Sequence, residues 1–542
     1  MAIPILSAVV FIALVALLYG VTIAPSPRLG VQPVEFMDEA YYAVLGADLA
    51  ETATETIYSP SGFTELPGLP KQTWYHWGEI WLAASVITVG GLDPMAARHF
   101  VVLPLILLAA VALVGTIVRR ASRTDSRVAF VIGAACCLFL APFPIPGPFF
   151  SSWASGLVFG ITLYGLSVIP VLLGIYILVK GRYSGSWACS IFVGGVAASI
   201  IPAHLVIAAL AFVGAGSAAL ARIVGELARR RRLPGIGPHL RRMLVALFVA
   251  SVVTAMWGTI TGHGLGANGL SDLVEPFNSE WLASVLLTGV GAGAFLAIPL
   301  AWILIRQQDT RLAPLFVGTM ALLAVGAVAW GARIGDFNMF HVFYGGIAVL
   351  AMPVAAIAIR LLWQAAAATG HRRIATALVL ITAVQLEVGV ASSTFRLYLF
   401  GPHDYEPIPV TILDEIKMLP QDAKLAYSCL PFEEVAFWDP KLVSITAHTG
   451  RRIVPMCFQA EIFGALTGGD VSQEAPSPLF EPAPQRELFP SADEQPSRAT
   501  LTEFLRRHGI GFIYSDVLHP NRLVPEAVPI AFEGTFRILK AP

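Results

Sequence analysis

The chain has 542 residues, of which 56% are hydrophobic and only 13% are charged, and its mean hydropathy is +0.71. Soluble domains carry roughly 25% charged residues, so this composition excludes an ordinary soluble protein and indicates an integral membrane protein. The net charge of −1 argues against a nucleic acid as partner.

Apolar segments of a length suited to a bilayer recur through the first 396 residues. Eleven spans are predicted, at 3–24, 98–118, 128–142, 156–179, 187–201, 204–222, 243–261, 282–305, 312–330, 341–360 and 374–396. The first lacks a basic N-terminal region, so we expect a retained helix rather than a cleaved signal peptide.

Basic residues are distributed unequally between the loops on the two sides. One set of loops holds 18 Lys and Arg residues, whereas the opposite set holds only Arg28, Lys71 and Arg333, with Arg98 at a boundary. Because positive charge stays in the cytoplasm, the N-terminus is predicted to be cytoplasmic. Loop 25–97 and everything after residue 396 would then lie outside.

The first outer loop, 25–97, is predicted to contain two helices that lie in the membrane interface. The apolar stretch 77–90 has 14 residues and would extend about 21 Å as a helix, which is too short to cross a bilayer. It carries aromatic residues suited to the headgroup level. A shorter amphipathic helix opens near Glu39, and the Pro- and Gly-rich turn 59–70 separates the two.

Past residue 396, charges and prolines return and short apolar runs alternate with polar helical segments. Helices are predicted at 408–418, 433–437 and 501–508, and strands at 424–429, 452–458, 511–515 and 535–539. This alternation is typical of a small α/β fold. We therefore predict a polytopic α-helical membrane domain over 1–396 and an extracytoplasmic α/β domain over 397–542.

Two carboxylates, Asp38 and Glu39, follow the first span almost at once. Carboxylates at the end of a membrane span are costly unless the site is wet or functional. Asp38 is our candidate general base, although a helix-capping Asp in a wet loop would give the same pattern. Glu39 is a candidate to orient an acceptor or bind a metal; the alternative is a solvated charge.

Lys71, Arg98 and Arg333 are the strongest candidates for binding a phosphate, because basic residues are scarce on the outer side. For Arg98 the alternative is a side chain that snorkels to the interface from the end of a span. Arg333 shares a short predicted outer loop with Asp336 and His341, where a simple ion pair is as reasonable as a donor site.

His76 and Glu79 are three residues apart and would share a helix face, where they are candidates to bind an acceptor or a metal. A His beside Trp residues in an interface is more often structural, so each residue alone is weak evidence.

A first span followed by Asp38-Glu39, an interfacial helix, a turn and a second interfacial helix resembles the GT-C glycosyltransferases. The branch most similar contains the protein O-mannosyltransferases and the lipid A aminoarabinose transferases. Residues 78–98 are similar to the second interfacial helix and the following Arg of that family, and 445–452 and 504–516 look like its outer domain. Trp74-Tyr75-His76 stands where the family tends to have His-Pro-Pro or Lys-Pro-Pro.

This resemblance implies an enzyme of the bacterial plasma membrane that takes a sugar from a polyprenyl-phosphate donor. The acceptor, a glycan, lipid or protein, would receive the sugar on the outer face. No cofactor is certain, and a divalent cation (Mg, Mn or Ca) is possible because an Asp-Glu pair serves as base or as ligand.

Two other classes of function compete with this hypothesis. A transporter or flippase of a lipid-linked glycan would carry charges in mid-span, often in matching halves. A non-catalytic assembly subunit would use its outer domain to bind a partner. The predicted spans are nearly free of charge and polar residues crowd at the outer interface, which favours chemistry at the membrane surface.

Overall fold

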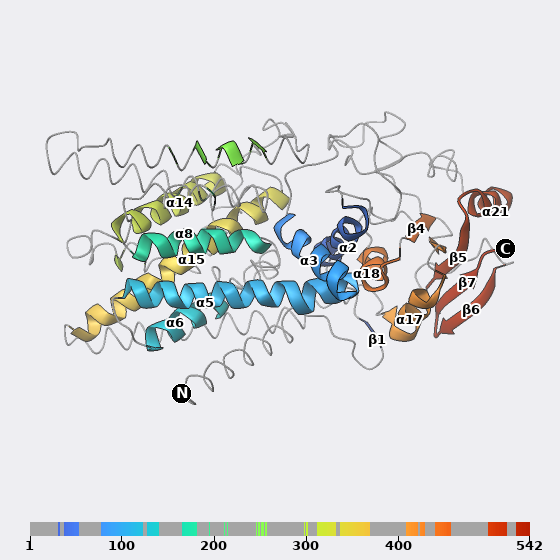
Figure 1. Ribbon diagram of the computed structural model, residues 1–542, viewed down its shortest axis with the longest axis horizontal. Helices are drawn as coiled ribbons and strands as arrows, with labels where there is room; N and C mark the ends of the chain where they lie inside the picture. The colour runs from blue at the N-terminus through green and yellow to red at the C-terminus, as the bar shows by residue number, and fades with distance from the viewer. Residues whose placement is uncertain are drawn as a thin grey trace.

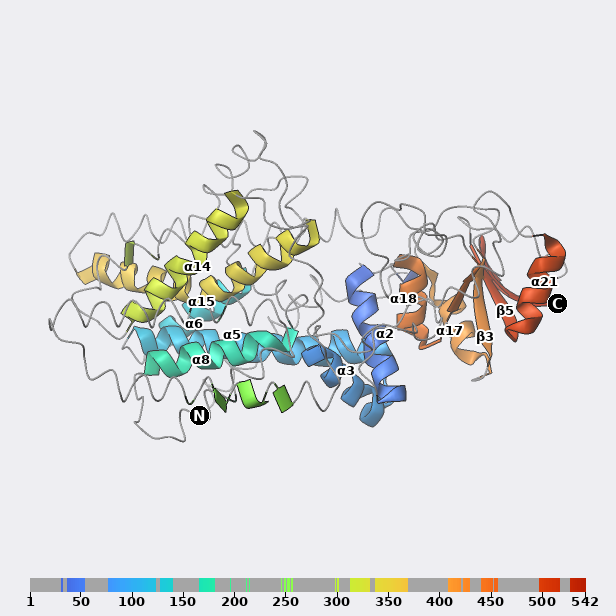
Figure 2. The ribbon, with the colours of Figure 1, turned by 90° about the horizontal axis from the view of Figure 1, so that it is seen from above.

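The computed structural model describes the elements named below and the residues adjoining them, namely 31–32, 37–53, 77–122, 127–139, 165–180, 312–331, 337–368, 408–420, 423–428, 440–451, 453–456, 497–516 and 527–542, with scattered residues between 195 and 301. A helical bundle occupies one end of the elongated molecule and an α/β region the other (Figure 1). Helices α2 (Met37–Thr52) and α3 (Trp77–Gly90) of the first outer loop lie between them (Figure 2).

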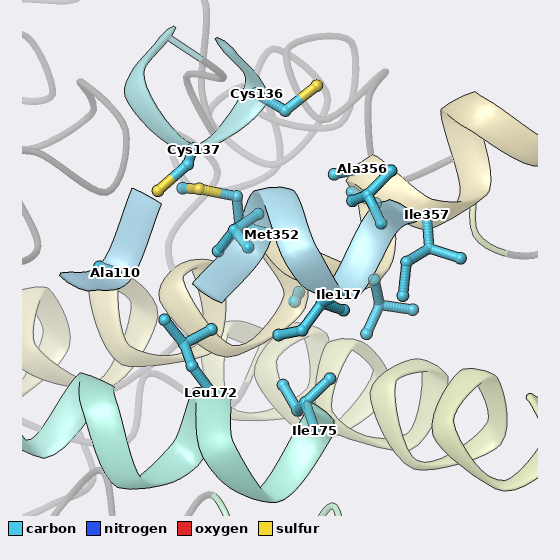
Figure 3. Packing of buried hydrophobic residues seen from close by; sticks show 14 of the residues in the cluster. Ala110, Ile117, Cys136, Cys137, Leu172, Ile175, Met352, Ala356 and Ile357 are labelled. Carbon is cyan, nitrogen blue, oxygen red and sulfur yellow. The ribbon is translucent and has the colours of Figure 1, made fainter. Parts of the chain in front are cut away.

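The described part of the bundle consists of long apolar helices around one buried cluster. These are α5 (Leu103–Ala121), α6 (Arg127–Phe139), α8 (Val168–Lys180), α14 (Ala313–Gly331) and α15 (Phe337–Ala368). Side chains from α5, α6, α8 and α15 meet in this cluster (Figure 3). Phe100, Leu105 and Val131 are more than half exposed on its outside, which suits a surface that faces lipid.

Among the described residues, one continuous helical stretch is long and apolar enough to cross a membrane. It runs over 28 residues from Pro94 to Ala121 through α4 (Pro94–Ala96), the π-helical segment η1 (Ala97–Val102) and α5. Shorter apolar helices lie at 127–137, 168–177, 315–324 and 350–366.

Among the described residues, continuous helices occupy five of the eleven predicted spans, those at 98–118, 128–142, 156–179, 312–330 and 341–360. In the fourth, the helix α8 covers only the second half of the prediction and follows a short 3-10 turn, η2 (Gly165–Ser167). The spans at 3–24 and 374–396 lie outside the described residues, and the four between 187 and 305 contain only scattered described residues. The total of eleven therefore stays a prediction.

The start of α15 corrects one expectation. His341, which the sequence places with Arg333 and Asp336 in a short loop, lies one turn inside α15. The stretch 337–340 contains no Gly or Pro and continues the apolar pattern of the span, so nothing in it ends the helix before His341.

Helices are present at both positions where interfacial helices are predicted, as α2 (Met37–Thr52) and α3 (Trp77–Gly90). Their location in the membrane interface stays a prediction. A tight turn leads from α3 to α4. Gly91 adopts a left-handed conformation with φ of 62°, which a residue with a side chain rarely tolerates, and Asp93 caps α4 by accepting a 2.8 Å hydrogen bond from the Ala96 backbone N–H. This turn places the start of the span directly beside α2 and α3.

The C-terminal α/β region contains a five-stranded sheet in the order β4-β3-β5-β7-β6. The strands are β3 (Lys424–Ser428), β4 (Ile453–Met456), β5 (Ile510–Ser515), β6 (Val528–Glu533) and β7 (Phe536–Lys540). β3, β4 and β5 are parallel, and β7 and β6 extend the sheet as an antiparallel hairpin. The helices are α17 (Val410–Met418), α18 (Pro440–Thr449) and α21 (Arg498–Arg507).

The sequence predicts most of these elements within one to three residues but misses α18 and β6. The helix expected at 433–437 lies outside the described residues. β6 is easily missed because its apolar residues are outward-facing, with Val528 and Phe532 largely exposed. The boundary at residue 397 and the extracytoplasmic side stay predictions.

Two contacts join the α/β region to the first outer loop. Strand β1 (Val31–Gln32) pairs antiparallel with β2 (Ile408–Pro409). Helix α18 packs against α2 and α4, and its Ala447 is fully buried in one cluster with Tyr42, Leu45 and Ile80. Figure 2 shows α18 beside α2, on the side of the sheet. The outer-loop helices are thus held between the bundle and the sheet.

Close packing of α5 on α6 gives a test of the bundle. A Cβ at Gly133 would meet Val118 Cγ2 at 2.9 Å and the Gly115 Cα at 3.0 Å, whereas a Cβ at Gly174 on α8 would meet nothing within 4 Å. Small residues at such contacts let membrane helices approach closely. We expect Gly133→Ala to destabilise the purified protein by about 1–3 kcal/mol, seen as a lower thermal midpoint in detergent.

Gly174→Ala is the matched control and should keep the wild-type midpoint or exceed it slightly. Equal midpoints for the two variants would show that α5 and α6 do not pack as described.

Candidate functional site

Three ionisable side chains are buried together where the membrane span begins. Glu79 lies on α3, and Arg98 and His99 lie on η1; each is about 1% exposed. Helix α2 packs beside this group and places the Tyr42 ring against Arg98. The π-helical geometry of η1 is itself unusual, because π-helical turns are rare and occur frequently at functional sites.

Arg98 is held by two contacts. Its guanidinium carbon lies 5.2 Å from the centre of the Tyr42 ring, at cation–π distance, and its Nη1 lies 3.1 Å from Nε2 of His99. A guanidinium has only donors, so His99 accepts this hydrogen bond, is neutral and carries its proton on Nδ1. The neutral imidazole therefore orients the guanidinium without cancelling its charge.

Glu79 is the buried acid beside this cation. Among the described residues, neither of its carboxylate oxygens has a hydrogen-bond partner. Burial raises the pKa of Glu79 to about 8; the charge of Arg98 and the polar backbone groups of Glu79 and Leu166 oppose the rise only in part. Near neutral pH, Glu79 is therefore mostly protonated and contributes little negative charge beside Arg98.

The α/β region forms another wall of the site through α18. Ala447 packs in the same cluster as Tyr42, the residue beneath Arg98. The next residue, His448, is half-buried and lies close enough to His99 for an electrostatic interaction between the two rings. The buried group thus lies at the junction of the bundle, the outer loop and the C-terminal region.

The structure brings together two of the residues singled out in the sequence, Glu79 and Arg98. Asp38 and Glu39 lie in the first turn of α2 by their position in the helix, and the side chains of these two residues and of His341 are not described. The remaining candidates, Lys71, His76, Arg333 and Asp336, lie outside the described residues.

Sequence reasoning missed three members of the group: Tyr42, His99 and His448. His99 directly follows an Arg at the start of an apolar span, a signal that could have singled it out. Tyr42 appears as one more apolar residue of an amphipathic helix. His448 lies far away in the sequence, and only the packing of α18 on α2 brings it near.

The described side chains contain no group of three or more His, Cys, Asp or Glu residues arranged to hold a metal ion. Asp38 and Glu39, the pair for which the sequence suggests Mg, Mn or Ca, are not among the side chains described.

Known structures of similar fold exist, although no family model and no curated protein matches the chain by sequence. The structure of ArnT from Cupriavidus metallidurans bound to undecaprenyl phosphate superposes with a TM-score of 0.53 at 13% identity, covering 98% of this chain and 97% of ArnT. The chain has the fold of the GT-C glycosyltransferases. This is a polytopic membrane fold, as the composition and the bundle indicate.

Two structures of the oligosaccharyltransferase from Archaeoglobus fulgidus are also similar, at 12% identity. One is AglB with an inhibitory peptide and a dolichol-phosphate (TM-score 0.49), and the other carries a tethered acceptor peptide (TM-score 0.48); each comparison covers 94% of this chain and 69% of the other.

Protonation of Glu79 gives a testable pH dependence. The unfolded chain ionises this carboxyl near its usual pKa of 4.5, whereas the folded protein keeps the proton until about pH 8. Folding stability is therefore undiminished below pH 4.5 and falls as the pH rises to 8, by an amount on the order of 5 kcal/mol. We expect Glu79→Gln to flatten the fall of the thermal midpoint between pH 5 and 8.5.

Ser85→Ala, on an exposed position of the same helix, is the control; it removes no ionisable group and should keep the wild-type pH dependence. Wild type and Glu79→Gln with parallel midpoint curves would contradict the buried neutral carboxyl.

Proposed function

We propose that this chain is a membrane glycosyltransferase that moves a sugar from a polyprenyl-phosphate donor to an acceptor on the extracytoplasmic face. The observation that carries the proposal is the buried guanidinium of Arg98, which lies against the Tyr42 ring and donates a hydrogen bond to His99 at the start of the span. A buried cation of this kind is costly alone and is stabilised by an anion. The phosphate of a lipid donor is an anion that reaches this depth.

The location of the group supports a lipid-linked donor. Arg98 and His99 lie in the helical stretch that crosses the membrane, next to two interfacial helices. A donor with a long prenyl chain would lie in the bilayer with its phosphate at this level. Undecaprenyl phosphate is bound to ArnT in the similar structure, which supports the same donor class here.

The proposed reaction is a displacement at the anomeric carbon of the sugar. Asp38 accepts the proton of the acceptor hydroxyl, and that oxygen attacks the anomeric carbon with inversion. The bond from this carbon to the phosphate oxygen breaks, and its electron pair leaves with the polyprenyl phosphate. Arg98 stabilises the charge of the leaving phosphate, with Lys71 and Arg333 as further candidates.

Glu39, His76, Glu79, Asp336 and His341 are proposed to surround the acceptor or the donor sugar. Glu79 in its protonated form offers one O–H donor and a free acceptor oxygen, which suits a sugar hydroxyl or a phosphate oxygen. A divalent cation at Asp38 and Glu39 is compatible with the proposal, and no step above depends on it. The α/β region, docked through α18, is proposed to bind the acceptor.

A transporter or flippase is less consistent with the described helices. α14 contains no charged residue, and the charged residues of α6 and α8 are Arg127 and Lys180 at their ends. Transport of a charged lipid-linked glycan would need polar groups along the path. The buried polar group lies instead at one end of the span, where surface chemistry takes place.

The proposal is tested by measuring sugar transfer from a panel of polyprenyl-phosphate sugars with the purified protein. We expect one donor to be turned over and Asp38→Asn to lose at least about 10²-fold of the rate, because the general base is removed. Asp414→Asn, on an exposed face of α17, is the control and should keep the wild-type rate.

Transfer by Asp38→Asn at the wild-type rate would remove Asp38 as the base. A folded protein that neither binds nor turns over any donor would support the transporter or the assembly subunit.

A further inference from the structure

Two further arginines lie at the opposite end of the bundle. Arg119 is in the last turn of α5 and Arg360 lies two turns before the end of α15; both are half-buried. Helices α5 and α15 contact each other. Figure 1 shows both helices running to the end of the bundle farthest from the sheet.

One contact between the two helix ends determines which faces meet. Gln364 Nε2 donates to the carbonyl oxygen of the buried Ser122 at 3.5 Å. Arg360 is four residues before Gln364, and Arg119 is three residues before Ser122, so each arginine lies one turn back on the face that makes the contact. Because the helices run in the same direction, we infer that the two arginines lie at a similar depth at the paired ends of α5 and α15.

Neither arginine has an acidic partner among the described residues. The Nε atom of each is buried and makes no hydrogen bond, although an Nε–H is an obligatory donor. Arg360 lies 5.1 Å from the centre of the Trp363 ring, and the Arg119 carbonyl accepts a 3.1 Å hydrogen bond from Ser122 Oγ. These contacts hold the backbone and the aromatic ring, and among the described residues none of them supplies a negative charge to either guanidinium.

We propose that Arg119 and Arg360, at the paired ends of α5 and α15, bind the phosphate headgroup of an anionic phospholipid. Guanidinium groups bind phosphate oxygens with paired hydrogen bonds, and basic sites between membrane helices bind such headgroups. Helix α6, which contacts both helices, exposes Val128 and Val131, an apolar surface for acyl chains. A lipid satisfies both the two arginines and this surface, whereas free phosphate satisfies only the arginines.

This site is independent of the proposed transferase function, because it lies at the other end of the span that carries Arg98. On the predicted topology it faces the cytoplasmic leaflet, where anionic lipids would hold the ends of α5 and α15 together. From the sequence, the basic residues on the predicted cytoplasmic side indicate only the orientation of the chain. That Arg119 and Arg360 lie on neighbouring helix ends follows only from the packing of α5 on α15.

The test is the rise in thermal midpoint of the delipidated full-length protein as phosphatidylglycerol is added in detergent micelles. We expect wild type to be stabilised by phosphatidylglycerol and not by phosphatidylcholine or inorganic phosphate. The double variant Arg119→Gln/Arg360→Gln should need roughly 10-fold more phosphatidylglycerol for the same rise. The control Arg120→Gln/Arg127→Gln, which removes two exposed charges from the same end, should respond as wild type.

The variant Arg119→Lys/Arg360→Lys keeps the charges and loses the forked geometry of the guanidinium groups, so its thermal midpoint should rise by an intermediate amount with phosphatidylglycerol. It also provides the test if the glutamine variant does not fold. An undiminished response of the glutamine variant, or an equal loss in the control, would overturn the site. Stabilisation by inorganic phosphate to the same extent would show a free-anion site in place of a lipid site.

Discussion

The burial of the Arg98 guanidinium at the start of a membrane span is the constraint on which the rest of the site depends. A charge in this position is costly, so each neighbour is arranged around it: Tyr42 offers the face of its ring, and His99 accepts a hydrogen bond as a neutral imidazole. Glu79 is close but protonated, because burial disfavours its charged form more than Arg98 favours it. Under the proposed function, the anion that binds at this buried cation is the phosphate of the lipid donor.

Several elements surround Arg98 and bury its guanidinium. Tyr42 comes from α2, Glu79 from α3, and the turn with Gly91 and Asp93 turns the chain sharply enough to bring η1 beside both. α18 closes the group from the C-terminal side, with Ala447 buried against α2. Helix α18, some 400 residues away in the sequence, thus contributes to a site formed by the first outer loop. Under the proposed function, the packing of α18 on α2 would bring the acceptor and the donor to one place.

The sequence predicts those features that depend on local composition. Five of the apolar spans, the helix at 77–90 and most strands of the α/β region follow from hydrophobic periodicity and length, and the described residues have them. The protonation of Glu79 was beyond such reasoning, because it depends on burial by segments distant in the sequence. The packing of α18 on α2, which brings His448 near His99, is missed for the same reason. The sequence places His341 in a loop because the nearby charges of Arg333 and Asp336, rather than the continuity of the helix, determine the predicted boundary.

The central claim is that Arg98 provides a preformed site for a lipid phosphate, and binding of undecaprenyl phosphate to the purified protein tests it most directly. We expect saturable binding to wild type, a loss of roughly 10-fold or more for Arg98→Gln, and partial retention for Arg98→Lys, which keeps the charge. Arg127→Gln, at the other end of the bundle, should bind as wild type. Equal binding by wild type and a folded Arg98→Gln would contradict the account.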